Sequence, residues 1–159
     1  MSAGSRQQGF TLAGALVLIA VLGAGMAAYG ELASHATQRE KEQELLFVGN
    51  QFRQAIGAYY ERTPGGAKRF PQKLEDLLED KRYPMPQHYL RKMYADPVTG
   101  KREWGLIASQ DGGIMGVHSL SESEPLKTAG FTSRDNTLAG TGRYSDWHFS
   151  YVPGVTQLR

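Results

Sequence analysis

The chain has 159 residues, a formal net charge of +2 and no cysteine. This length fits one small domain and one anchoring segment. The nearly balanced charge argues against binding nucleic acid or a membrane surface by charge alone, and the lack of cysteine excludes a disulfide framework.

An uncharged apolar run without proline extends over residues 10–29. A helix of that length covers about 30 Å, the thickness of the hydrocarbon core of a bilayer. Arg6 is the only charge that precedes the run, which favours a cytoplasmic amino terminus. The sequence therefore predicts a single-pass protein of the bacterial inner membrane, with its C-terminal domain in the periplasm.

The residues that open the run carry a second signal. A short polar leader ends in Gly9 and is followed at once by Phe10, Thr11 and Leu12. This arrangement resembles the precursor signal of type IV pilins and of the pseudopilins of type II secretion. The resemblance implies cleavage between Gly9 and Phe10 by a prepilin peptidase, and methylation of the new amino terminus.

The same resemblance implies that the apolar helix anchors the subunit in the membrane and later joins other pilins or pseudopilins in the core of a helical filament. The residues expected to form this anchor and core are Phe10, Thr11, Leu12, Gly14, Leu16 and Ile19. Two positions depart from the family pattern. Gly14 stands where the family usually has a glutamate. A proline that is common in the family about twenty residues into the mature helix is missing, and Glu31 stands near its place. Within the family, a subunit without that acid is best suited to the filament tip, which gives a tip role as a hypothesis.

Residues 31–62 continue the helical pattern but become amphipathic. Apolar side chains recur at steps of three and four and predict one buried face: Leu45, Val48, Phe52, Ile56 and Tyr59. Glu42 and Arg53 fall largely off this stripe. Residues 63–66, Thr-Pro-Gly-Gly, end the helix. The expected divisions are a leader (1–9), a transmembrane half-helix (10–30), an amphipathic half-helix (31–62) and a globular head (63–159).

The head reads as a short helix at residues 70–78, followed by strands. The order of Asp96 and Pro97, a glycine and then Trp104 resembles the junction between helix and sheet in pseudopilins. The pattern predicts strands at 103–109, 114–120 and 147–152, with a hairpin turn at Asp111-Gly112. The expected fold class is α+β and pilin-like, with a long N-terminal helix, transmembrane in its first half, packed on a small antiparallel sheet.

Residues 121–146 show little periodicity and predict a long surface loop that could recognise a partner or carry no ligand. Some pseudopilins bind calcium beside their sheet, so acids of this region are candidate metal ligands, although solvated acids explain them as well: Asp111, Glu122, Glu124 and Asp135. No other cofactor is expected. No nucleophile motif or metal-binding histidine pair is apparent, so the sequence does not predict an enzyme.

The interpretation that unites these features is a pseudopilin-like structural subunit of a type II secretion filament or a related type IV pilus. Two alternatives stay open. One is a minor pilin that binds DNA or a surface, because basic residues alternate with tyrosines between residues 81 and 102. Neighbouring acids favour a solvated surface there instead. The other alternative is a signal-anchored periplasmic domain that is never cleaved.

Overall fold

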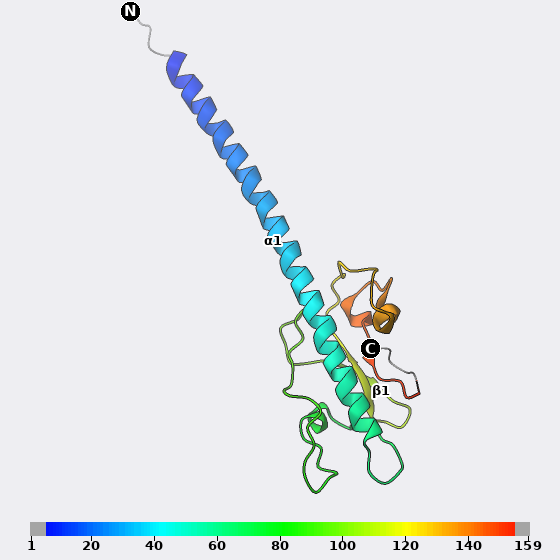
Figure 1. Ribbon diagram of the computed structural model, residues 1–159. Coiled ribbons are helices and arrows are strands. Elements are labelled where there is room, and N and C mark those ends of the chain that lie inside the picture. Colours follow the sequence, from blue (N-terminus) through cyan, green and yellow to red (C-terminus); the bar gives the residue numbers. More distant parts are fainter. Residues whose placement is uncertain (1–5, 155–159) are drawn as a thin grey trace, which may run out of the picture. The chain divides into compact units, whose positions relative to one another are not determined.

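The computed structural model describes residues 6–154, with side chains described for residues 12–22 and 34–154. The chain divides into two compact units, Met1–Gln38 and Arg39–Arg159. One helix, α1 (Arg6–Glu61), contributes to both units, and the remaining elements belong to the second (Figure 1).

The helix α1 begins before Phe10, so the end of the predicted leader is helical. It continues through both halves because no proline interrupts the sequence as far as Glu61. It ends where the Thr63 hydroxyl donates to the Tyr60 carbonyl over 2.9 Å, and where Gly65 and Gly66 adopt φ values of 86°. Only glycine adopts such values without strain, so this Gly pair turns the chain away from the helix.

The predicted transmembrane half of this helix needs correction. Among the residues whose side chains are described, no helix is long and apolar enough to cross a membrane. The side chains of residues 10, 11 and 23–30 lie outside the described part. The finding contradicts the fold class with a transmembrane half and the inner-membrane, single-pass location.

The second unit contains a three-stranded antiparallel sheet of order β1-β2-β3, as the α+β pattern predicts. The strands are β1 (Gly105–Ala108), β2 (Ile114–His118) and β3 (Phe149–Ser150), each shorter than expected. Val117 is the central position, since it faces Leu106 on one side and Phe149 on the other. The predicted turn is confirmed: Ser109 N–H donates to Gly113 O over 2.7 Å and closes the β1–β2 hairpin.

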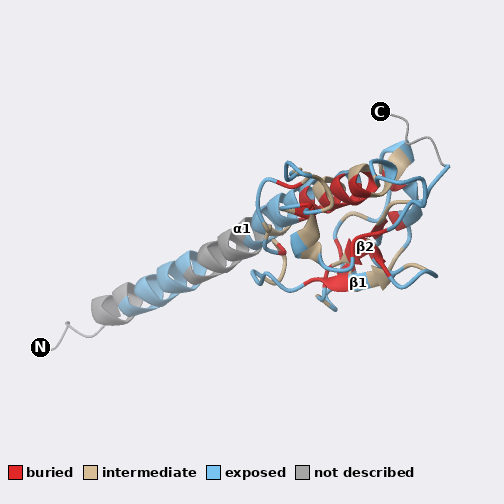
Figure 2. Cartoon of the chain, turned by 90° about the horizontal axis from the view of Figure 1, so that it is seen from below, coloured by how far each residue is buried: buried red, intermediate tan, exposed pale blue. Residues whose placement is uncertain are grey.

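The core lies between the C-terminal part of α1 and the sheet. All five residues of the predicted stripe are buried, with exposed fractions between 0 and 7% (Figure 2, red): Leu45, Val48, Phe52, Ile56 and Tyr59. The helix approaches the sheet closely at Gly49, where an added Cβ would lie 2.4 Å from the Phe149 ring. Phe52 meets the Trp104 ring edge-on, with centroids 5.1 Å apart.

Two expected elements differ from the prediction. The helix expected at 70–78 is a short 3-10 helix, η1 (Leu74–Leu77), preceded by backbone N–H groups of Gln72 and Lys73 that donate to Asp76. The expected loop at 121–146 contains η2 (Ser133–Leu138) and η3 (Tyr144–Asp146) and buries three side chains there: Asp135, Leu138 and Tyr144. That segment is therefore partly a core element.

Candidate functional site

The most unusual surface of the first unit is the apolar segment, residues 12–22 of α1. Every residue of the segment is exposed, and none has a polar side chain. Its seven large side chains are 58–65% exposed (Figure 2): Leu12, Leu16, Val17, Leu18, Ile19, Val21 and Leu22. A helix that is apolar all round is normally buried against other apolar surfaces. The segment therefore has the composition of a helix that is buried against other apolar surfaces.

The predicted filament-core residues divide accordingly. Leu12, Gly14, Leu16 and Ile19 lie in the apolar segment, and nothing lies within 4 Å of a Cβ built on Gly14. The backbones of Gly9, Phe10 and Thr11 are helical. Their side chains lie outside the described residues, so the predicted cleavage site is not tested by the structure.

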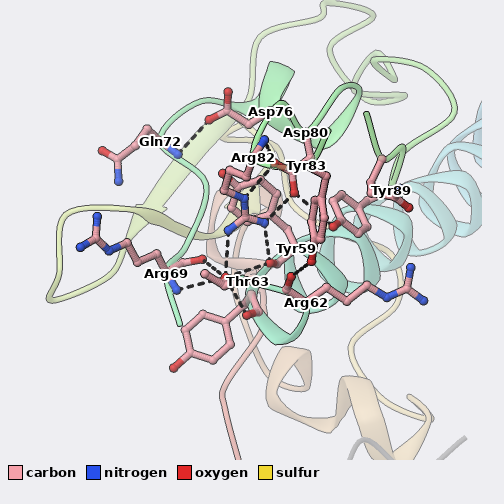
Figure 3. Close-up of polar contacts among 12 residues, drawn as sticks. Tyr59, Arg62, Thr63, Arg69, Gln72, Asp76, Asp80, Arg82, Tyr83 and Tyr89 are labelled. Carbon is pink, nitrogen blue, oxygen red and sulfur yellow. Dashed lines mark hydrogen bonds and ion pairs between the residues drawn. The ribbon is translucent and has the colours of Figure 1, made fainter. Parts of the chain in front are cut away.

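The second unit has a polar hub around Arg82 at the C-terminal end of α1 (Figure 3). The guanidinium group donates from Nε and Nη2 to both carboxylate oxygens of Asp80, over 2.8 and 2.7 Å. It also donates from Nη1 to Thr63 Oγ1 over 2.8 Å and from Nη2 to the Tyr59 carbonyl over 2.9 Å. The Tyr59 carbonyl is among the last of the helix and also accepts a hydrogen bond from Thr63 Oγ1 over 3.2 Å. Arg82 therefore caps α1 from a distant part of the chain.

Burial and charge tune the titrating groups of this hub. Burial alone raises the pKa of the Asp80 carboxyl, but the hydrogen bonds and the charge of Arg82 outweigh it and hold that pKa below its usual range. Burial, together with the hydrogen bond to Asp80, raises the pKa of Tyr89 to about 12. The Arg82 guanidinium carbon lies 3.5 Å from the centre of the Tyr59 ring, a stacked cation–π contact. The hub is thus an ionised and tightly paired structure.

Two charged residues of α1 hold the 121–146 segment against the head. Arg53 Nη1 donates to Asp135 Oδ1 over 2.7 Å, and both side chains are nearly inaccessible. Glu42 accepts hydrogen bonds from the backbone N–H groups of Leu126 and Lys127 and from the Tyr144 hydroxyl. Glu42 and Arg53 lie off the apolar stripe, as predicted, yet they are buried. Their partners lie more than 80 residues away, and no local pattern could reveal them.

The candidate metal ligands are not brought together. Asp135 is paired with Arg53, and burial of its carboxyl is outweighed by Arg53 and Arg134, which keep its pKa low. Glu122 forms an ion pair with Arg143 over 2.5 Å. Within the described part of the chain, no group of three acids or histidines could hold a metal ion. Asp111 lies exposed at the hairpin turn, and Glu124 is also exposed.

Asp96 and Trp104, singled out by their order, form hydrogen bonds in the segment before β1. Asp96 also links this segment to Ser119, the residue after β2. Asp96 is fully buried and accepts a hydrogen bond from the Ser119 hydroxyl over 2.6 Å, while its other oxygen accepts from Val98 N–H. Trp104 Nε1 donates to the Tyr94 carbonyl over 2.9 Å. Pro97 follows Asp96 in the same turn. These residues hold the fold together and form no open site.

The basic cluster considered for nucleic acid is partly neutralised. Arg82 is bound to Asp80, and Lys81 Nζ lies 3.8 Å from Glu79. Arg91 and Arg102 are exposed, and Arg102 is followed directly by the exposed acid Glu103. A charge-mixed surface of this kind lacks the continuous positive potential that attracts a phosphate backbone.

Comparisons of the chain with protein-family models, with curated proteins and with solved structures find no match. A functional assignment must therefore come from the residues themselves. The features that bear on it most directly are the apolar segment and the leader motif that precedes it.

Proposed function

We propose that this chain is a pseudopilin-like structural subunit of a type II secretion filament or a related type IV pilus, processed by a prepilin peptidase. The observation that carries the proposal is the apolar segment, which is exposed on all sides in the single chain. We propose that the N-terminal helices of other subunits cover it. The role is structural, and no catalytic step is part of it.

The energetics favour such a cover. Burial of one large aliphatic side chain contributes about 1.5–3 kcal/mol, so the seven in the apolar segment represent a gross gain on the order of 10 kcal/mol per subunit. Loss of rotational and translational freedom offsets part of that gain. In residues 45–59 the same helix already buries its apolar stripe within its own unit. One helix thus has two apolar parts, of which only the first needs a partner.

The processing step is tested by the intact mass and the N-terminal residue of the protein, with and without a co-expressed prepilin peptidase. The expected result is peptidase-dependent loss of residues 1–9, which leaves Phe10 at the terminus. Gly9→Glu should block the cleavage. Glycine has no side chain and leaves the scissile bond accessible to the peptidase, whereas glutamate places a bulky charged side chain beside it. An unchanged Met1 terminus in the presence of active peptidase would rule out the prepilin class.

The assembly step is tested by cross-linking, for which the absence of native cysteine is an advantage. Leu16→Cys places one thiol in the apolar segment, and Arg91→Cys places one on the exposed surface of the head as a matched control. Covalent dimers are expected from Leu16→Cys under mild oxidation and not from Arg91→Cys. Equal yields from both variants would show that helix contact is not specific.

Gly14 bears on the position of the subunit. Because the family glutamate is absent there, we propose a minor or tip position, with few copies in each filament. Quantitative mass spectrometry of sheared filaments measures this ratio. A ratio near one copy per major subunit would contradict a tip position and leave the subunit proposal intact.

A further inference from the structure

A pocket of about 510 Å³ lies beside the Arg82 hub, at the end of α1. Its charged lining residues are Arg69 and Arg82, and none of its lining residues is acidic. Tyr59 and Phe70 contribute aromatic walls. The pocket is therefore positive and partly apolar, which is the character of a site for an organic anion.

The groups at its wall are hydrogen-bond donors without acceptors. Arg82 uses one N–H of Nη1 for Thr63, and its second Nη1 N–H has no partner in the described chain. Arg69 is exposed, and its guanidinium group extends away from that of Arg82 with no contact to the other residues drawn (Figure 3). The backbone N–H groups of Gly65 and Ala67 also lack an acceptor within the described residues. These donors can be satisfied by a ligand group that only accepts hydrogen bonds.

Charge balance selects a single negative charge. Asp80 already neutralises Arg82 through two hydrogen bonds, so the pocket has one unmatched positive charge, that of Arg69. A carboxylate carries one negative charge and two acceptor oxygens, and it matches the fork of a guanidinium group. A phosphate dianion would bring an excess charge close to Asp80.

The neighbouring pocket provides an internal contrast. It has a volume of about 400 Å³ and shares Tyr59 and Arg82. Its other lining residues are four acids and one lysine: Glu75, Asp76, Glu79, Asp80 and Lys81. An anion is repelled on that side of Arg82 and attracted on the other. The side of Arg69 is thus the one that an anion can occupy.

We infer that the pocket lined by Arg69, Arg82, Tyr59 and Phe70 binds a carboxylate attached to an apolar group. Such a group is found at the C-terminus of a peptide and on a glutamate side chain. Both sources present the same chemistry, and the inference does not depend on the filament proposal.

Calorimetry on the full chain tests the inference, with detergent present to cover the apolar segment. The probes are N-acetyl-phenylalanine and its uncharged amide. The carboxylate probe should bind and the amide should not. Arg69→Gln should weaken binding about tenfold or more, because it removes a charge-assisted hydrogen bond. The controls Arg91→Gln and Glu79→Gln should each stay within about twofold, as expected for side chains that do not line this pocket.

Two peptides identify the source of the carboxylate. The first has a free C-terminus and no glutamate, and the second has an amidated C-terminus and one glutamate. Binding of either peptide supports the site. Equal binding of the amide probe, unchanged binding in Arg69→Gln, or no binding of any carboxylate overturns the inference. Tighter binding of inorganic phosphate than of N-acetyl-phenylalanine also overturns it, since the charge argument would then be wrong.

Discussion

The two apolar parts of α1 have similar side chains, but those of one part are buried and those of the other are exposed. In residues 45–59 the apolar positions recur every three or four residues, and they are buried against the sheet. In residues 12–22 the side chains are apolar at every position and all are exposed. The stripe specifies one face and therefore one partner within the chain. The uniform surface specifies no single face, which suits contact with several neighbours at once.

The largest test of this comparison removes one large side chain from each part. Phe52→Ala should reduce the free energy of unfolding by about 3–5 kcal/mol, because it leaves a cavity beneath Trp104. Leu16→Ala should change it by less than about 0.5 kcal/mol, since Leu16 is 61% exposed. Urea denaturation of the unassembled chain measures both. A large loss for Leu16→Ala would mean that the apolar segment is covered within one chain.

A second test concerns the buried charges of α1, which lie in its C-terminal part among the residues whose side chains are described. Arg53→Ala leaves the Asp135 carboxylate buried without its main partner, and an unfolding cost of about 3 kcal/mol is expected. Arg39→Ala is the control, because Arg39 is exposed on the same helix. The same denaturation experiment reports both variants. Similar small effects would indicate that the ion pair is unimportant for holding the 121–146 segment.

Glycine replacements should give opposite signs at the two ends of the helix. Gly49→Ala places a methyl group 2.4 Å from the Phe149 ring and should cost about 1–3 kcal/mol. Gly14→Ala meets nothing within 4 Å and should stabilise the helix by up to about 1 kcal/mol. The thermal midpoint and the helical circular dichroism signal distinguish the two. Destabilisation by both substitutions would remove the contrast.

The smallest effect is a dependence on pH that arises from two carboxyl groups of the second unit. The folded pKa values of Asp80 and Asp135 are lowered, so the stability that they add is present above their unfolded values. It is lost as the pH falls from about 5 through the folded pKa values. Residues 12–22 have no titrating group and should contribute nothing. Asp135→Asn should flatten the acid limb of a plot of unfolding free energy against pH, and an unchanged slope would argue against this assignment.

The parts of the fold that were predictable depend on short-range patterns. The buried stripe from Leu45 to Tyr59 follows from helical periodicity, and the β1–β2 hairpin follows from Asp111-Gly112. The Asp80–Arg82 hub was not predicted, although the two residues are close in sequence. Arg82 donates a hydrogen bond to the carbonyl of Tyr59, which lies 23 residues earlier in the chain. The candidate calcium ligands failed to converge because Asp135 turns inward to Arg53. Chain composition gave no sign of that pairing.

Among the candidate sites, the apolar segment was visible in the sequence, and the anion pocket was not. Its donors come from the end of α1, from the loop that follows and from Arg82, and only folding brings them to one place. The transmembrane interpretation covered residues 10–30. The finding for the described residues contradicts that interpretation, and helix contact between subunits is the use that we propose for the part that is described.

The Glu42–Tyr144 hydrogen bond sets a condition on biosynthesis. Its partners are 102 residues apart, so Glu42 leaves the ribosome long before Tyr144 does. At ordinary rates of translation this interval lasts roughly 5–20 s. During that time the sheet that covers the stripe of α1 is incomplete, because β3 is made after Tyr144. The nascent chain therefore presents two apolar surfaces instead of one, and a chaperone that shields the helix until synthesis ends would protect both.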